Sequence, residues 1–249
     1  MKDSTPIVYL LGAGRSGTTL IATVLDGISW IDALGEMHHF PAYARDNAYC
    51  ACGKRLQSCS FWSKVLTRIG EPESYYQNIK AICDRSEAHR RIPGLLVSPK
   101  QPEYLKIQER IFSCCAQQRS GNVLLDASKF IARYLMLRQS ARLSLRGVYV
   151  VRDVRGVVES FNKKVQTRKR PLAAILYYLL INLFGELTFR LYKDVIKIRY
   201  EDFIRQPEAA VTKILDHVAP EKEKPGTLPE QFQIPHIVGG NRMKSRGTI

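Results

Sequence analysis

The sequence lacks the long apolar runs, the leader segment and the internal repeats that mark several large classes of protein. No uninterrupted stretch reaches the roughly 18–20 apolar residues of a membrane span, and residues 1–6 carry no signal-type pattern. No period of about 20–50 residues recurs, which excludes solenoids and propellers. We therefore expect a cytoplasmic globular protein that forms a single domain over residues 1–249.

Acidic residues are scarce relative to basic ones. The chain has 38 Lys and Arg against 23 Asp and Glu, so its net charge is +15 and its isoelectric point is about 9.7. Such an excess favours a polyanionic partner. Nucleic acids, anionic lipids, sulfated sugars and nucleotide cosubstrates all qualify, and charge alone does not choose among them.

Cysteines are few, and the familiar C-x2-C pair is absent from the sequence. Cys50, Cys52 and Cys59 stand in a C-x-C-x6-C arrangement that could hold a soft metal ion. A closed zinc site needs a fourth ligand, however, and the spacing supplies none. We therefore expect reduced thiols on a surface excursion, and a protein that requires no metal.

Short β-rich runs alternate with helical patterns along the chain. This alternation predicts an α/β fold with a parallel sheet flanked by helices. Residues 28–121 contain many prolines and read as a partly helical insertion after the first βα unit. The leucine-rich stretch Leu172–Phe184 predicts a core helix, with contact to a membrane surface as the alternative. The predicted strands are Ile7–Leu11, Val123–Asp126, Val148–Val151 and Val195–Tyr200.

A P-loop-like glycine loop, Gly12–Thr19, separates the first strand from the first helix. Such a loop presents backbone N–H groups to an anion. Its glycines fit the G-x-G-x-x-G dinucleotide pattern, and Asp32 lies 20 residues beyond Gly12, so an NAD(P)-dependent oxidoreductase stays open. Thr18 stands where a nucleoside triphosphatase carries lysine, which disfavours that class. Arg15 instead places a cation inside the loop.

A second anion site is predicted after the strand Val148–Val151. Arg152 ends that strand and Ser160 lies in the following helix, so a guanidinium and a hydroxyl could converge on one phosphate. Two separated sites suit a ligand with two anionic groups.

Five motifs together resemble the sulfotransferases that use 3′-phosphoadenosine 5′-phosphosulfate (PAPS). The resemblance covers most of the chain, is of the bacterial type, and in the region of Glu36 is similar to the heparan-type and tyrosyl-protein enzymes. The motifs are Gly-Arg-Ser-Gly-Thr-Thr-Leu at 14–20, Leu-Asp-x-Ser-Lys at 125–129, Arg-Asp-x-Arg-Gly-Val-Val-x-Ser-Phe at 152–161, Arg-Tyr-Glu-Asp-Phe at 199–203 and Gly-Gly-Asn at 239–241.

The resemblance implies roles for individual residues in sulfuryl transfer from PAPS to a hydroxyl group. Glu36 would be the general base, with His39 as the alternative, and Lys129 and Arg15 would stabilise the leaving group. Arg152 and Ser160 would bind the 3′-phosphate. The remaining donor-binding residues would be Gly14, Arg15, Ser16, Gly17, Thr18 and Thr19 around the phosphosulfate, with Gly240 and Asn241 closing over the donor.

The acceptor and the partners are less defined by the sequence. A carbohydrate or glycolipid hydroxyl is the expected acceptor, and no nucleic-acid partner is expected. The acceptor side would be built from residues 28–121, where aromatic side chains could stack on a sugar ring or belong to the core. A non-enzymatic binder of anionic polymers remains the second alternative. The aromatic residues in question are Tyr43, Tyr49, Trp62, Tyr75 and Tyr76.

Overall fold

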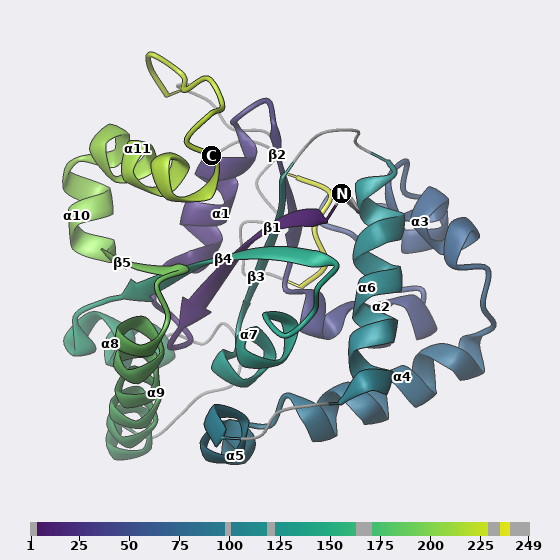
Figure 1. Ribbon diagram of the computed structural model, residues 1–249, viewed down its shortest axis with the longest axis horizontal. Coiled ribbons are helices and arrows are strands. Elements are labelled where there is room, and N and C mark those ends of the chain that lie inside the picture. Colours follow the sequence, from purple (N-terminus) through teal and green to yellow (C-terminus); the bar gives the residue numbers. More distant parts are fainter. Residues whose placement is uncertain (1–3, 98–100, 119–122, 163–170, 229–234, 240–249) are drawn as a thin grey trace.

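A five-stranded parallel sheet forms the centre of the molecule (Figure 1), in a computed structural model that describes residues 4–97, 101–118, 123–162, 171–228 and 235–239. The strand order is β2-β3-β1-β4-β5. This architecture confirms the predicted α/β class. The strands are β1 (Thr5–Gly12), β2 (Ile31–Gly35), β3 (Val123–Lys129), β4 (Leu143–Val151) and β5 (Val195–Arg199).

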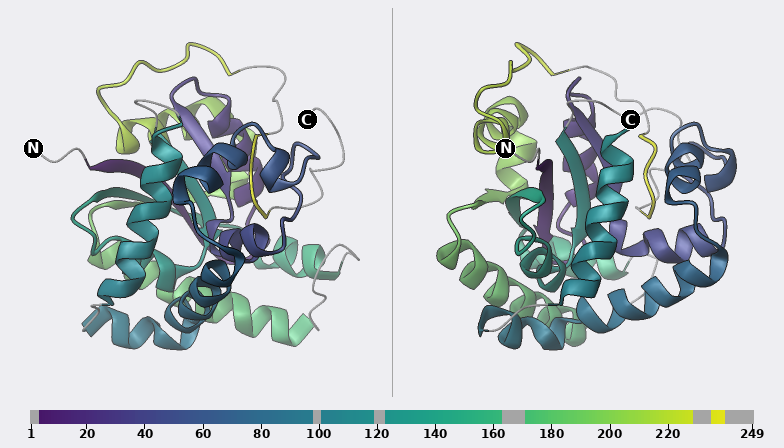
Figure 2. Two further views of the ribbon diagram at one scale, coloured as in Figure 1. Left: turned by 90° about the vertical axis from the view of Figure 1, so that its right-hand side faces the viewer. Right: turned by 45° about the vertical axis from the view of Figure 1, so that its right-hand side comes forward.

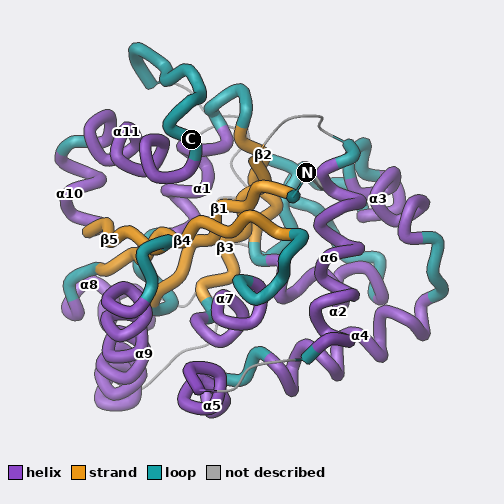
Figure 3. The backbone as a smooth tube through the Cα atoms, viewed as in Figure 1, coloured by secondary structure: helices purple, strands orange, loops and turns teal. Residues whose placement is uncertain are grey.

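Helices enclose the sheet on both faces (Figure 3), as parallel sheets require because both of their faces are apolar. The helices are α1 (Thr18–Asp26), α2 (Phe40–Arg45), α3 (Trp62–Ile69), α4 (Glu73–Ser86), α5 (Ile92–Val97), α6 (Pro102–Ala116), α7 (Ile131–Leu137), α8 (Val154–Asn162), α9 (Pro171–Leu191), α10 (Tyr200–Arg205) and α11 (Pro207–Val218), with short 3-10 turns at Met37–His39, Leu56–Ser58 and His89–Arg91.

Alternate residues of β1 divide the core into two layers. Val8 and Leu10 face α1, α10 and α11, whereas Ile7, Tyr9 and Leu11 face α6, α7 and α9. All five side chains are buried, so β1 is the central strand in packing as well as in sheet order. The loop that follows β1 is therefore anchored on both sides.

Strand β2 is an edge strand that the sequence analysis did not predict. Ile31–Gly35 pairs in parallel with β3, with Asp32 opposite Leu124. The insertion predicted at residues 28–121 thus contains one strand of the sheet, and its helical part, α2 to α6, begins after Gly35. The strand was missed because a single acidic residue interrupts a run of only five residues, all of which are buried.

Helix α9 is not the buried core helix that its composition predicts. Leu172 and Leu176 are 76% and 68% exposed, while Ala174 and Ile181 on the opposite side are 0% and 1% exposed. Residues Leu172–Leu191 are long and apolar enough to cross a membrane by length and composition, yet only 22% of that window is buried. The helix lies on the outside of the molecule (Figure 2), where one face contacts β1, β4 and β5. The leucines of the other face are exposed.

The aromatic side chains of the insertion serve mainly the core. Trp62 is fully buried against Phe40, with ring centroids 5.3 Å apart. Tyr76 is 4% exposed and Tyr49 is 57% exposed. For Trp62 and Tyr76 the structure therefore supports the core alternative rather than contact with an acceptor.

Candidate active site

The carboxyl ends of β1, β3 and β4 border a cavity of about 680 Å³. Because β1 lies between β3 and β4, the residues that follow these three strands become neighbours in space. Most of the residues predicted for the site line this cavity, namely Gly14, Arg15, Gly17, Thr18, Thr19, Glu36, Lys129, Arg152 and Ser160.

The glycine loop needs glycine at two positions for steric reasons. Gly12 has φ 146°, and a Cβ there would lie 2.4 Å from the Val150 carbonyl oxygen. Gly17 has φ 87°, and its Cβ would lie 2.2 Å from ring carbons of Tyr200. The loop therefore fits closely between β4 and α10, and it places the start of α1 at the cavity.

The start of α1 is suited to an anion. Its first turn contains no acidic residue, and no side chain caps the backbone N–H groups there. Ser16 is fully buried, and its hydroxyl has no hydrogen-bond partner among the described residues. A buried hydroxyl without a partner is costly, so a bound phosphate or sulfate oxygen fits this position.

Arg15 and Arg152 lie against each other at the same end of the sheet. Arg15 has φ 72°, and its guanidinium lies 5.5 Å from the ring centre of Phe161. Burial lowers the pKa of Arg15, and the charge of Glu36 opposes that change. Arg152 donates from Nη1 to the Arg15 carbonyl oxygen at 3.1 Å. Both predicted anion sites therefore belong to one cavity.

Arg152 is held in place from two sides. Its guanidinium stacks 4.4 Å from the ring centre of Tyr200. A Cβ at Gly156, in the first turn of α8, would lie 2.9 Å from Arg152 Nε, so a larger residue there would displace the guanidinium from this position. Ser160 lies further along α8 and lines the same cavity.

Glu36, which follows β2, and Lys129, the last residue of β3, form an ion pair in which each side chain is only about one-sixth exposed. Lys129 has φ 71°, an unusual conformation for a lysine and one that often marks functional sites. The backbone N–H of Glu36 donates to the Val238 carbonyl at 2.8 Å. His39 Nε2 lies 3.7 Å from the second carboxylate oxygen of Glu36.

The ligand atoms of Glu36, His38 and His39 lie within 4.8 Å of one another. The ammonium group of Lys129 already neutralises the Glu36 carboxylate, and its charge would repel a metal ion. Burial, followed by the neighbouring His39, lowers the pKa of His38 well below its ordinary value. The group therefore combines a carboxylate with a neutral imidazole and suits proton transfer better than metal binding.

A buried network supports the strand ends that carry these residues. The Asp126 carboxylate accepts hydrogen bonds from the Ser128 hydroxyl and from the Ser128 backbone N–H, the latter at 2.9 Å. It also accepts from Arg133 Nε at 3.0 Å, and Arg133 donates to Glu87 at 2.6 Å. The Ser128 hydroxyl oxygen accepts from the His38 backbone N–H at 3.0 Å. Asp126 and Ser128 precede Lys129 in β3, so this network fixes the end of the strand that carries the lysine.

Two tyrosines of the cavity were not predicted as site residues. The Tyr177 hydroxyl, on α9, accepts a hydrogen bond from the Gly14 backbone N–H at 3.0 Å. Tyr200, the first residue of α10, lines the cavity and stacks on Arg152. Its position directly after β5 could have identified it, whereas nothing local marks Tyr177 within its helix.

Among the described residues, two that were predicted for the site do not line the cavity, namely Ser16, which is fully buried, and Asp32. Gly240 and Asn241 lie outside the described residues. Asp32 is the second residue of β2, near the amino end of that strand, and is 7% exposed. A ribose-binding acid would stand at the carboxyl end of the strand. The position of Asp32 therefore removes the main support for the NAD(P) alternative.

Two solved structures resemble the fold. One is a sulfotransferase domain from the curacin biosynthetic pathway, with a TM-score of 0.55 and 18% identity, over 90% of this chain and 76% of that one. The other is a sulfotransferase domain from the Synechococcus PCC 7002 olefin synthase, with a TM-score of 0.53 and 18% identity, over 90% of this chain and 80% of that one. A search of curated proteins finds no match.

The family comparison covers most of the chain. The model of the sulfotransferase family matches residues 6–222, which include every cavity residue described above and all five strands except the first residue of β1. The chain therefore belongs to the sulfotransferase family.

Proposed function

We propose that this protein transfers the sulfuryl group of PAPS to a hydroxyl of a carbohydrate or glycolipid by in-line displacement, in the cytoplasm. The main support for PAPS as the donor is that Arg15 and Arg152 line the same cavity, beside the start of α1. PAPS has a 5′-phosphosulfate and a 3′-phosphate, and these two anionic groups need two cationic positions. We assign the phosphosulfate to residues 14–19 and the 3′-phosphate to Arg152 and Ser160.

In the proposed reaction the acceptor oxygen forms a bond to sulfur while the bond from sulfur to the phosphate oxygen breaks. The products are the sulfate ester and adenosine 3′,5′-bisphosphate, and Glu36 takes the proton of the hydroxyl. Lys129 and Arg15 stabilise the negative charge that develops on the leaving phosphate oxygen. The ion pair of Glu36 with Lys129 supports this division of roles, because it holds base and cation side by side at the ends of β2 and β3.

Replacing Arg152 by Ala should weaken the binding of adenosine 3′,5′-bisphosphate about 10- to 100-fold. The variant loses a charge-assisted hydrogen bond to phosphate, a contact worth about 1.5–3 kcal/mol. Isothermal titration calorimetry of both proteins measures this change. Arg146→Ala is the matched control, because Arg146 is an exposed residue of β4, the strand that Arg152 follows, and lies outside the cavity.

The same titration tests the donor assignment as a whole. Unchanged affinity in Arg152→Ala would contradict the 3′-phosphate site. Tight binding of NAD(P) by the unmodified protein, with no binding of the bisphosphate, would overturn the proposed donor.

The exposed leucines of α9 support a lipid-linked acceptor at a membrane surface. Leu176, Leu180 and Leu183 are 68%, 49% and 57% exposed and recur at helical spacing on one face. Tyr177 of the same helix lines the cavity, so an acceptor held at this face would lie close to the reaction centre. Five of the eight residues at 163–170, directly before α9, are Lys or Arg. A basic segment beside an apolar helix face suits an anionic membrane surface.

Substitution of Leu176, Leu180 and Leu183 together by Gln should lower the affinity for phosphatidylserine-containing vesicles at least about tenfold, because apolar area is no longer withdrawn from water. Co-sedimentation measures the bound fraction, and binding of the unmodified protein should also fall with salt. Ile204→Gln on α10 is the control, since Ile204 is 50% exposed on a different helix. Equal sedimentation of the triple variant and the unmodified protein would rule out this surface.

A further inference from the structure

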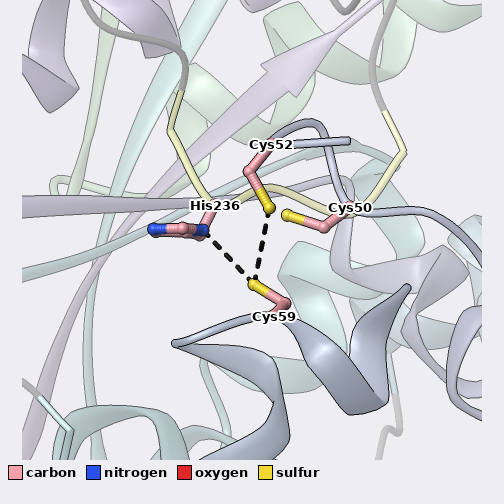
Figure 4. Close-up of side chains that lie close together, drawn as sticks. All are labelled: Cys50, Cys52, Cys59 and His236. Carbon is pink, nitrogen blue, oxygen red and sulfur yellow. Dashed lines mark hydrogen bonds between the residues drawn. The ribbon is translucent and has the colours of Figure 1, made fainter. Parts of the chain in front are cut away.

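Three cysteines and one histidine converge at a place separate from the cavity. Figure 4 shows the side chains of Cys50, Cys52, Cys59 and His236 directed toward one another. Their ligand atoms all lie within 4.8 Å of one another. His236 is 177 residues beyond Cys59, which is why the cysteine spacing did not reveal a fourth ligand.

Two distances within this group match the edges of a tetrahedron around zinc. With Zn–S near 2.3 Å and Zn–N near 2.0–2.1 Å, a regular tetrahedron has S···S edges of about 3.8 Å and S···N edges of about 3.6 Å. The Sγ atoms of Cys52 and Cys59 are 3.7 Å apart, and Cys59 Sγ lies 3.3 Å from His236 Nδ1. These two distances fit a zinc tetrahedron, and the remaining pairs, including those with Cys50, lie within 4.8 Å of one another.

The surroundings hold His236 in the orientation that a metal ligand needs. Its other ring nitrogen, Nε2, lies 3.5 Å from the Ser60 hydroxyl, and metal-binding histidines commonly donate that N–H to a neighbouring oxygen. The Phe61 ring is nearly parallel to the imidazole at 14°, with centroids 6.4 Å apart. Trp62 Nε1 donates to the His236 carbonyl at 2.8 Å. Three consecutive residues thus fix both the ring and the backbone of His236.

We propose that Cys50, Cys52, Cys59 and His236 form a closed structural zinc site. Three sulfurs and one imidazole nitrogen are a donor set typical of structural zinc. Cys50 and Cys59 are 2% and 0% exposed, and all four positions are taken by protein, so the ion has no open position for catalysis. This proposal revises the expectation that the protein requires no metal.

The site connects two distant parts of the chain next to the proposed base. The segment 235–239 joins the edge of β2, where Val238 N donates to Leu34 O at 3.0 Å and Glu36 N donates to Val238 O at 2.8 Å. On its other side, Ala51 N donates to Ile237 O at 3.2 Å. Zinc would fasten this segment to the cysteine loop through His236. We assign the ion the role of holding the strand that supports Glu36.

The test is metal analysis of the full-length protein, expressed with zinc and purified without chelators. We expect about one zinc per chain, and the same occupancy in Cys114→Ser, whose buried cysteine lies on α6 outside the group. Cys52→Ser and His236→Gln should lose most of the zinc. Because Cys52 is only partly buried, its replacement disturbs packing least. Removing zinc with a strong chelator should lower the melting temperature by about 5 °C or more, with recovery on addition of zinc.

A second measurement keeps the proposal testable if a variant fails to fold. Cobalt(II) added to the zinc-free protein should give the intense visible bands of a tetrahedral site and a sulfur-to-cobalt charge-transfer band. Zinc well below one equivalent together with a featureless cobalt spectrum would overturn the proposal. So would a disulfide between two of these cysteines in the purified protein, or full zinc occupancy in His236→Gln and Cys52→Ser.

Discussion

The Glu36→Gln protein should turn over at least about 100-fold more slowly than the unmodified enzyme, with almost unchanged affinity for adenosine 3′,5′-bisphosphate. Glutamine keeps the size of the side chain but cannot accept the proton of the attacking hydroxyl. The proposed donor contacts lie in the loop after β1, at the start of α1, directly after β4 and on α8, so they remain in place. Sulfate transfer from radiolabelled PAPS to a glycolipid pool measures turnover, and calorimetry measures donor binding.

Two further variants make this experiment decisive. The control is Glu73→Gln, which makes the same change at an exposed glutamate in the first turn of α4. This variant should be fully active. His39→Gln tests the alternative base, because His39 Nε2 lies 3.7 Å from Glu36. Undiminished turnover in Glu36→Gln would show that Glu36 is not the general base. If turnover falls only in His39→Gln, the imidazole of His39 would be the base instead.

The Arg133→Met protein should be less stable by about 3–5 kcal/mol, the usual cost of removing one partner of a buried ion pair. Arg133 is 0% exposed, and it bridges Asp126 and Glu87 while donating to Gln108 at 2.9 Å. Methionine fills much of the volume but leaves two buried carboxyl groups without their cation. Urea denaturation followed by circular dichroism measures the loss.

The loss of stability in Arg133→Met should also depend on pH, and the pKa of Glu87 determines the direction of that dependence. Burial is the largest cause that raises the pKa of Glu87, and Arg133 opposes it, so the variant should raise that pKa further. A carboxyl whose pKa is raised by folding favours the folded state at low pH and loses that contribution as pH rises through the folded-state pKa. The deficit of Arg133→Met should therefore be smaller near about pH 5 than near about pH 8.

The control for this variant is Arg142→Met. Arg142 is 68% exposed, and its Nε lies 3.8 Å from a Glu109 oxygen. A pair of this kind contributes only about 0–1 kcal/mol, so little change is expected. A deficit in Arg133→Met no larger than that of the control would show that the buried network does not stabilise the fold.

Sequence patterns predicted most of the strands of the sheet, but not all of them. Four of the five strands were predicted, because each is a run of apolar residues next to a turn and a helix. Strand β2 was missed, since its stability comes from pairing with β3 and from burial of all five residues, which only the assembled sheet provides. For α9 the prediction of a core helix was wrong, since several of its leucines are exposed. Apolar composition does not specify which faces of a helix meet the core.

The sequence by itself determined the chemical groups of this protein: an anion-binding glycine loop with a cation inside it, a second arginine after a strand, and a carboxylate near the first helix. These patterns are local, since loop geometry and helix starts depend on residues close together in the chain. Only the tertiary structure decided which groups meet. The parallel order of the sheet brings Arg15 beside Arg152, and closure over 177 residues brings His236 to Cys59. Contacts at such separations depend on how helices and strands pack, and no local pattern encodes that packing.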